Sequence, residues 1–222
     1  MKSDIQIQND VIEQLQWEPG LNAAEIGVAV KNGIVTLSGI VDTYSKKIAA
    51  EDAAKKIAGV KAIAEDIQVG VSPSFRKTDA EIAEVVVFAL KWNTTIPDEK
   101  IKVRVEDGVV SLDGEVEWDY QRNAAVNAIE KVAGVRRINN YITIKPSLKP
   151  NNVKQKITAA FIRSATIDSG KIWVETDGSK VILNGTVRSF AEREDAEKAA
   201  WLAPGVTSVD NNLVMEEEAF AF

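Results

Sequence analysis

The 222-residue chain contains no cysteine and no histidine. The absence of cysteine excludes disulfide bonds, zinc–thiolate sites and thiol nucleophiles. The absence of histidine removes the side chain that most often serves as a general base at neutral pH and as a metal ligand. We therefore expect no catalytic residues, no cofactor and no metal site, and the chain is predicted to be a binding or structural protein and not an enzyme.

Positive charge and long apolar runs are also scarce. The 27 lysine and arginine residues are outnumbered by 33 aspartate and glutamate residues, so a net charge of −6 argues against a nucleic-acid partner. No run approaches the ~18 apolar residues of a membrane span, so no transmembrane segment is expected. The N-terminal residues 1–8 lack the apolar core of a signal peptide. They predict a cytoplasmic protein, or a periplasmic one if a signal peptide has been removed.

The sequence repeats one pattern three times, which indicates tandem modules. Each copy contains the motif Val-x-Leu-x-Gly-x-Val, followed 20 residues after its glycine by a Gly-Val pair. The motif occupies residues 35–41, 110–116 and 181–187, and the later glycines are Gly59, Gly134 and Gly205. The modules are predicted to span residues 1–72, 76–147 and 148–222. Because each has about 70 residues, near the lower limit for an independent core, we expect the modules to pack on one another.

Each copy predicts a helix, two strands, a second helix and a third strand. The first helix has apolar residues at helical spacing. These residues are Ile7, Val11 and Leu15 in the first copy, Ile82, Val86 and Leu90 in the second, and Val153, Ile157 and Phe161 in the third. The two strands are expected to be joined by turns at Asn32-Gly33, Asp107-Gly108 and Asp177-Gly178, dipeptides that tolerate the positive φ of tight hairpins.

The second helix is rich in alanine and is predicted to end at the later glycine in the first two copies. In the third copy Pro204 is expected to stop it. The last strand, starting at Val60, Val135 or Val206, returns through a helix and is therefore predicted to run parallel to a hairpin strand. The predicted fold class is α+β: three αββαβ modules, each a three-stranded mixed sheet with two helices on one face.

This order of elements, with its two recurring glycines, resembles the BON domain of bacteria. The resemblance covers residues 4–69, 79–144 and 151–215. It implies a non-enzymatic protein linked to osmotic or envelope stress, and attachment to phospholipid surfaces is the function usually proposed for the family. It implies no catalytic motif.

Glycines and carboxylates have a structural interpretation. Gly33 and Gly39 are too widely spaced for a phosphate-binding loop and lie on a hairpin, so we assign them to a turn and to a strand that the helix layer approaches closely. Glu192, Glu194 and Asp195 come at the start of a helix, where negative charge offsets the helix dipole. We expect them to be structural or solvated.

The first helix of the second copy contains more apolar residues than its own core requires. Its core stripe already covers the sheet, so Val87 and Phe88 point elsewhere. Trp92 ends this helix, and Trp17 holds the equivalent position in the first copy. A helix that is apolar on more than one face is buried on two sides, so we interpret these four residues as a candidate interaction surface for another module, a protein or a lipid.

The outer face of the sheet provides further candidates. Strand alternation places Ile40 on this face in the first copy, and Trp173 and Ile182 on it in the third. We predict that these faces are covered by each other, by another chain or by a ligand. No role is assigned to the C-terminal residues 220–222, because chain ends fray.

Two functions remain open from the sequence. The leading hypothesis is a scaffold that acts through protein–protein or module–module contacts, with an unknown partner or by self-association. The alternative is a peripheral phospholipid-binding protein, with Phe88 and Trp92 as insertion residues. Without a basic patch its attraction to anionic lipid would be weak. An enzymatic function would need a serine or lysine nucleophile with a buried base, and no spacing indicates one.

Overall fold

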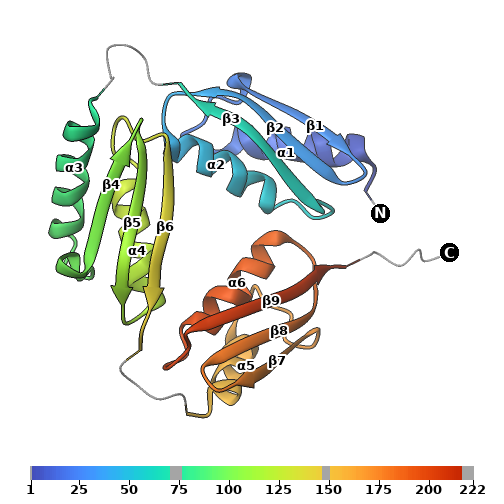
Figure 1. Cartoon of the computed structure of the whole chain (residues 1–222). Coiled ribbons are helices and arrows are strands. Elements are labelled where there is room, and N and C mark those ends of the chain that lie inside the picture. The colour runs from blue at the N-terminus through green and yellow to red at the C-terminus, as the bar shows by residue number, and fades with distance from the viewer. Residues whose placement is uncertain (1, 71–76, 147–150, 217–222) are drawn as a thin grey trace. The chain divides into compact units, whose positions relative to one another are not determined.

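The computed structural model describes residues 2–70, 77–146 and 151–216, in three αββαβ modules (Figure 1). Residues 220–222, to which the sequence analysis assigned no role, lie outside these ranges.

The first module contains α1 (Asp4–Trp17), β1 (Ile26–Lys31), β2 (Ile34–Val41), α2 (Tyr44–Lys55) and β3 (Ala62–Val69). The second contains α3 (Asp79–Trp92), β4 (Ile101–Glu106), β5 (Val109–Val116), α4 (Asp119–Ile129) and β6 (Arg137–Ile144). The third contains α5 (Val153–Arg163), β7 (Ile172–Asp177), β8 (Lys180–Val187), α6 (Phe190–Trp201) and β9 (Ser208–Met215). In the first and second modules a short 3₁₀ helix, Ala23–Glu25 and Asp98–Lys100 respectively, leads into the first strand.

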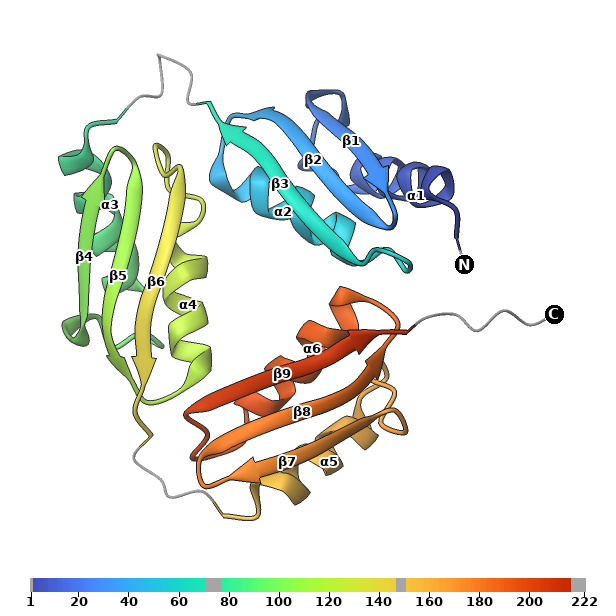
Figure 2. The ribbon, with the colours of Figure 1, turned by 45° about the vertical axis from the view of Figure 1, so that its right-hand side comes forward.

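Each sheet has its second strand in the centre, in the orders β1-β2-β3, β4-β5-β6 and β7-β8-β9. In the second and third modules the hairpin is antiparallel, and the last strand runs parallel to the central one. Both helices of a module lie on the same face of its sheet (Figure 2). The predicted α+β class and three-module organisation are therefore confirmed.

The core of each module lies between its sheet and its helices. All nine predicted apolar positions of the first helices are buried, as are the inward residues of the central strands. In the first module the second helix contributes Ala50, Ala53 and Ala54, each with no exposed surface. Small side chains at these positions let that helix lie close to the sheet.

The hairpin turn of the third module differs from the prediction. Strand β7 continues through Asp177, which pairs with Lys180, so the turn residues are Gly178 and Ser179 and not Asp177 and Gly178. Of the two, only Gly178 has a positive φ, 58°. Glycine at the first central position is the requirement of a type II′ turn, whereas the turns at Asn32-Gly33 and Asp107-Gly108 have positive φ at both residues.

The later glycine does not end the second helix, contrary to prediction. Helix α2 ends at Lys55, and Gly59 then occupies the third position of a turn that the Val60 N–H closes onto the Ile57 carbonyl. Its φ of 96° fits the third position of a type II turn. Pro204 likewise does not stop α6, which ends at Trp201. It precedes Gly205 at the second position of the equivalent turn, where proline is favoured.

The strand glycine also has a different neighbour from the one expected. A Cβ atom on Gly114 would lie 2.2 Å from the carbonyl oxygen of Lys100, and one on Gly185 would lie 2.0 Å from that of Lys171. The close approach is therefore made by the backbone entering the first strand and not by the helix layer.

Candidate interaction surface on helix α3

Helix α3 is fixed to the second module at its first turn. The Thr78 hydroxyl accepts a hydrogen bond from the Glu81 N–H at 3.3 Å, and the Glu81 carboxylate accepts one from the Thr78 N–H at 2.8 Å. These two bonds form a capping box. They satisfy backbone donors that the first turn leaves without intrahelical partners, so they stabilise the start of α3.

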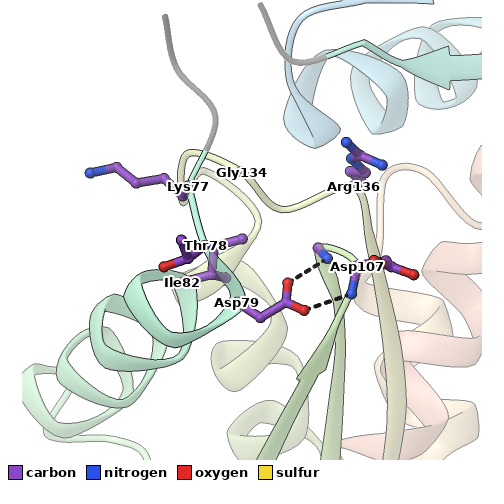
Figure 3. Close-up of a pocket in the computed structure, with 8 residues that line it drawn as sticks. Lys77, Thr78, Asp79, Ile82, Asp107, Gly134 and Arg136 are labelled. Carbon is purple, nitrogen blue, oxygen red and sulfur yellow. Dashed lines mark hydrogen bonds between the residues drawn. The ribbon is translucent and has the colours of Figure 1, made fainter. Parts of the chain in front are cut away.

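Asp79 ties the same turn to the β4–β5 hairpin. Its carboxylate accepts hydrogen bonds from the backbone N–H groups of Asp107 and Gly108, both at 2.9 Å (Figure 3). Asp4 makes the equivalent bonds to Asn32 and Gly33 in the first module, at 2.8 and 2.9 Å. The sequence analysis missed this contact, although an aspartate in the same helical position of two copies is a signal that could have revealed it.

A hollow of about 260 Å³ lies where α3 meets this hairpin. Lys77 and Arg136 line it, but both side chains extend away from the Asp79 carboxylate in Figure 3. The turn N–H groups that could bind an anion are already occupied by that carboxylate. We therefore assign the hollow a structural role.

The face of α3 that points away from the core is apolar. Ile82, Val86 and Leu90 are buried against the sheet. On the other side Phe88 is 61% exposed and Trp92 is 72% exposed, and their ring centroids are 5.6 Å apart.

Val85, which the sequence analysis did not select, completes this face. It is 45% exposed and stands three residues before Phe88 and seven before Trp92, the spacing that places side chains along one side of a helix. We call Val85, Phe88 and Trp92 the α3 stripe. Val87 is 52% exposed but lies about 100° around the helix from Phe88, on the side opposite Val85 and Trp92. The structure thus brings together two of the predicted residues and leaves Val87 apart.

The equivalent helix faces of the other modules carry charge. In α1 the stripe positions are held by Asp10, Glu13 and Trp17, and in α5 by Lys156, Ala159 and Arg163. Trp17 is 82% exposed. The next residue, Glu18, forms an ion pair with Lys56, with 2.8 Å between Glu18 Oε1 and Lys56 Nζ. Because the same fold accepts charge at these positions twice, the module itself does not require apolar residues there in α3.

The remaining candidates lie on separate sheets. Trp173 is 57% exposed and Ile182 is half-buried on the outer face of the third module, where Trp173 pairs with Asn184 across the hairpin. Ile40, in the first module, is 62% exposed. That another chain or a ligand covers these faces stays a prediction.

Glu192 is the buried carboxylate of the third module, at 3% exposure. It accepts hydrogen bonds from the backbone N–H groups of Asp168 at 2.7 Å and Arg188 at 2.8 Å, and from Arg188 Nε at 3.0 Å. Burial raises the pKa of this carboxyl, but the bonds from Arg188 and from the two N–H groups outweigh burial and hold the pKa below its ordinary value of 4.5. This environment stabilises the charged form as a helix-capping group.

The described residues contain no group of three or more His, Cys, Asp or Glu side chains that could hold a metal ion. Within the same residues, no helix has the length and apolar character needed to cross a membrane. The predicted cytoplasmic location is not tested by this finding.

The comparison with known families settles the membership of the chain. The BON domain model matches residues 3–71, 78–146 and 151–217, one match in each module. The chain belongs to the BON domain family. The resemblance inferred from the repeated motif is thereby confirmed.

Two curated proteins are similar in sequence to this BON chain. Osmotically-inducible protein Y of Escherichia coli (strain K12) is 31% identical over 144 residues, which are 61% of this chain and 71% of that protein. An uncharacterized protein in the gshII 5′ region of Anaplasma centrale is 26% identical over 127 residues, 56% of this chain and 84% of that protein.

Among solved structures, CdsD, a structural protein of the type III secretion system of Chlamydia trachomatis, is 14% identical. The match covers 95% of this chain and 93% of that one, at a TM-score of 0.26. Its C-terminal domain matches at a TM-score of 0.27.

Proposed function

We propose that this BON protein is a non-catalytic scaffold that binds a protein partner through the α3 stripe. Its units are the three modules at residues 1–72, 76–147 and 148–222. The exposed apolar face of α3 supports the proposal, because the equivalent faces of α1 and α5 are charged and the fold therefore does not account for it. Aromatic side chains at the centre of a surface are also the residues that contribute most to protein interfaces.

The charges around the stripe favour a protein over a lipid surface. Glu81 and Glu84 lie one turn before Val85 and Phe88, and they outnumber the lysine of this surface, Lys91, which precedes Trp92; all three are exposed. They would face the headgroups of an anionic membrane if Phe88 and Trp92 inserted, and like charge would oppose that insertion. The E. coli relative is named for osmotic induction, and we include a stress-related setting in the proposal for this chain.

Site-specific photo-crosslinking tests this proposal. A photoreactive amino acid replaces Phe88 in the full chain, and the matched control places it at Ala159, the equivalent position of α5. We expect discrete crosslinked protein species from position 88 and few from position 159. Equal crosslinking from the two positions would refute a docking role for the α3 stripe.

Vesicle flotation tests the lipid alternative. The full chain and the double variant Phe88→Ala/Trp92→Ala are mixed with anionic or neutral vesicles at low and moderate salt. We expect no flotation of either protein. Flotation of the wild type that the double variant loses would replace the protein partner with a phospholipid surface.

A further inference from the structure

The α3 stripe is bordered by two charges of opposite sign at equivalent positions. Glu84 immediately precedes Val85, and Lys91 immediately precedes Trp92, so the two charged residues stand one heptad apart on the same flank of the stripe. Both are exposed, and neither makes a hydrogen bond or an ion pair with another described residue. Seven residues of helix separate them by about 10 Å, too far for them to pair with each other.

This arrangement is complementary to itself when two α3 helices pack antiparallel. In an antiparallel pair related by a two-fold axis, a given flank of one helix meets the same flank of its partner. Glu84 of one chain then lies beside the partner's Lys91, and Lys91 beside the partner's Glu84. In a parallel pair this flank would instead meet the opposite one, where Ala89 offers no charge.

The apolar residues fit the same register. With Glu84 opposite the partner's Lys91, Phe88 packs against the partner's Val85, and the two-fold axis repeats that contact. Trp92 then extends over the first turn of the partner helix. Val85, Phe88 and Trp92 occupy the a and d positions of a heptad, which form the seam between paired helices.

We propose that the partner docked on the α3 stripe is α3 of a second copy of this chain, antiparallel to the first. This inference rests on the proposed docking role of the stripe. The charge pattern selects this occupant, because an unrelated partner would not require opposite charges at equivalent positions. The first helices of the other modules lack the pattern: α1 has Asn9 and Gln16 at the two flank positions, and α5 has Gln155 and Ile162.

The size of the surface sets the expected affinity. Phe88 and Trp92 at 61% and 72% exposure offer on the order of 300 Å² of aromatic surface per chain. A standard interface buries about 800 Å² per partner, so this aromatic surface lies below the standard size, among weak and transient complexes. We therefore expect a dimer with a Kd on the order of micromolar, weakened by salt because both ion pairs are at the rim.

Sedimentation equilibrium of the full chain over a range of concentrations tests the proposal. The wild type should show a monomer–dimer equilibrium, and Phe88→Glu should be monomeric. Glu84→Lys and Lys91→Glu should each dimerise about tenfold more weakly, because two attractive pairs become repulsive. Glu13→Lys is the matched control: it makes the same charge change on an exposed position of α1, and it should leave the Kd unchanged.

Mixing the two charge variants gives the decisive result. An equimolar mixture of Glu84→Lys and Lys91→Glu restores both opposite-charge pairs, and the double variant Glu84→Lys/Lys91→Glu restores them within one sequence. Both samples should dimerise as the wild type does. A mixture that stays as weak as its components would overturn the antiparallel pairing even if Phe88→Glu abolished the dimer.

The failure of this inference can be distinguished from failure of the proposed function. A wild type that is monomeric at all concentrations, or a dimer that Phe88→Glu leaves intact, would overturn the second copy as occupant. Crosslinking from position 88 to a different protein would then still support a docking role. Crosslinking of position 88 to position 88 of another copy supports both.

Discussion

Glu192 allows a quantitative test of what holds the third module together. Its two carboxylate oxygens are used differently: Oε1 accepts the Asp168 N–H and, at 3.4 Å, an N–H of Arg188 Nη2, and Oε2 accepts both the N–H and the Nε–H of Arg188. The substitution Glu192→Gln preserves the shape and one acceptor oxygen, but it places an amide NH₂ against the donors of Arg188. The variant therefore separates the charge of this group from its volume.

The expected cost follows from these bonds. Hydrogen bonds to a charged group contribute about 1.5–3 kcal/mol, so Glu192→Gln should destabilise the third module by about 2 kcal/mol and Glu192→Ala by about 3 kcal/mol. Glutamine is compatible with this position of the fold. Gln121 holds the aligned position of the second module, where one amide oxygen accepts the N–H groups of both Glu117 and Trp118.

The pH dependence provides a second measurement. Because the folded-state pKa of Glu192 lies below its ordinary value of 4.5, its contribution is fully present above that value and is lost as the pH falls through the folded-state pKa. The wild-type third module should therefore lose stability on acidification. Glu192→Gln should lose less over the same interval, because it has no carboxylate to protonate.

Hydrogen exchange measured by mass spectrometry follows each module separately, which a single melting curve of a three-module chain cannot do. At neutral pH, peptides from α6 in Glu192→Gln should exchange roughly 30-fold faster, equivalent to about 2 kcal/mol. Peptides from α1 and α3 serve as internal controls and should not change. Unaltered exchange in α6, or an acid sensitivity equal to that of the wild type, would show that the carboxylate is not stabilising.

Two further predictions concern the second module. Asp79→Ala removes both hydrogen bonds to the β4–β5 turn and should destabilise the second module by about 1–2 kcal/mol. The loss should appear as faster hydrogen exchange of the hairpin amides. An unchanged exchange rate would show that Asp79 does not hold the turn against α3. Gly134→Ala places a Cβ 2.9 Å from Ile82 Cδ1 on a backbone with φ of 93°, and should lower stability by about 2 kcal/mol in chemical denaturation. Gly20→Ala, whose Cβ would meet no atom within 4 Å, is its control and should be nearly neutral.

The arrangement of strands and helices could be predicted because each element has its own local pattern. The apolar residues at helical spacing, such as Ile82, Val86 and Leu90, all proved to be buried. The returning strand was expected to be parallel because a helix separates it from the hairpin, and β5 and β6 confirm this. These features depend on hydrophobic burial and on chain connectivity, which a single sequence displays directly.

The roles of two residues with restricted or unusual backbone conformations were not predicted correctly. Gly114 meets the carbonyl of Lys100, and no local pattern identifies that neighbour. Pro204 was expected to stop a helix, whereas it occupies the favoured position of a turn beyond the helix end. In both cases the residue type indicated a constraint on the backbone but not its cause, which is a distant carbonyl for Gly114 and a local turn for Pro204.

The candidate surface was predicted in part for a related reason. Phe88 and Trp92 stood out because they exceed what one core can bury, and the structure leaves both exposed. Val85 was not among the predicted residues, although helical periodicity places it three residues before Phe88 and seven before Trp92, on one side of the helix. The same periodicity separates Val87 from the stripe.

The three copies within one chain separate what the fold requires from what it permits. Where all three agree, as at the inward positions of the first helix, burial in the core explains the agreement. At the stripe positions the copies differ, with Glu13 and Ala159 in place of Phe88. The fold does not require an aromatic residue at position 88, because the first module has the same fold with glutamate at the equivalent position. We therefore infer that Phe88 contributes to association and not to the fold. Because Glu84 and Lys91 flank it, association with a second copy of the chain should be measured first.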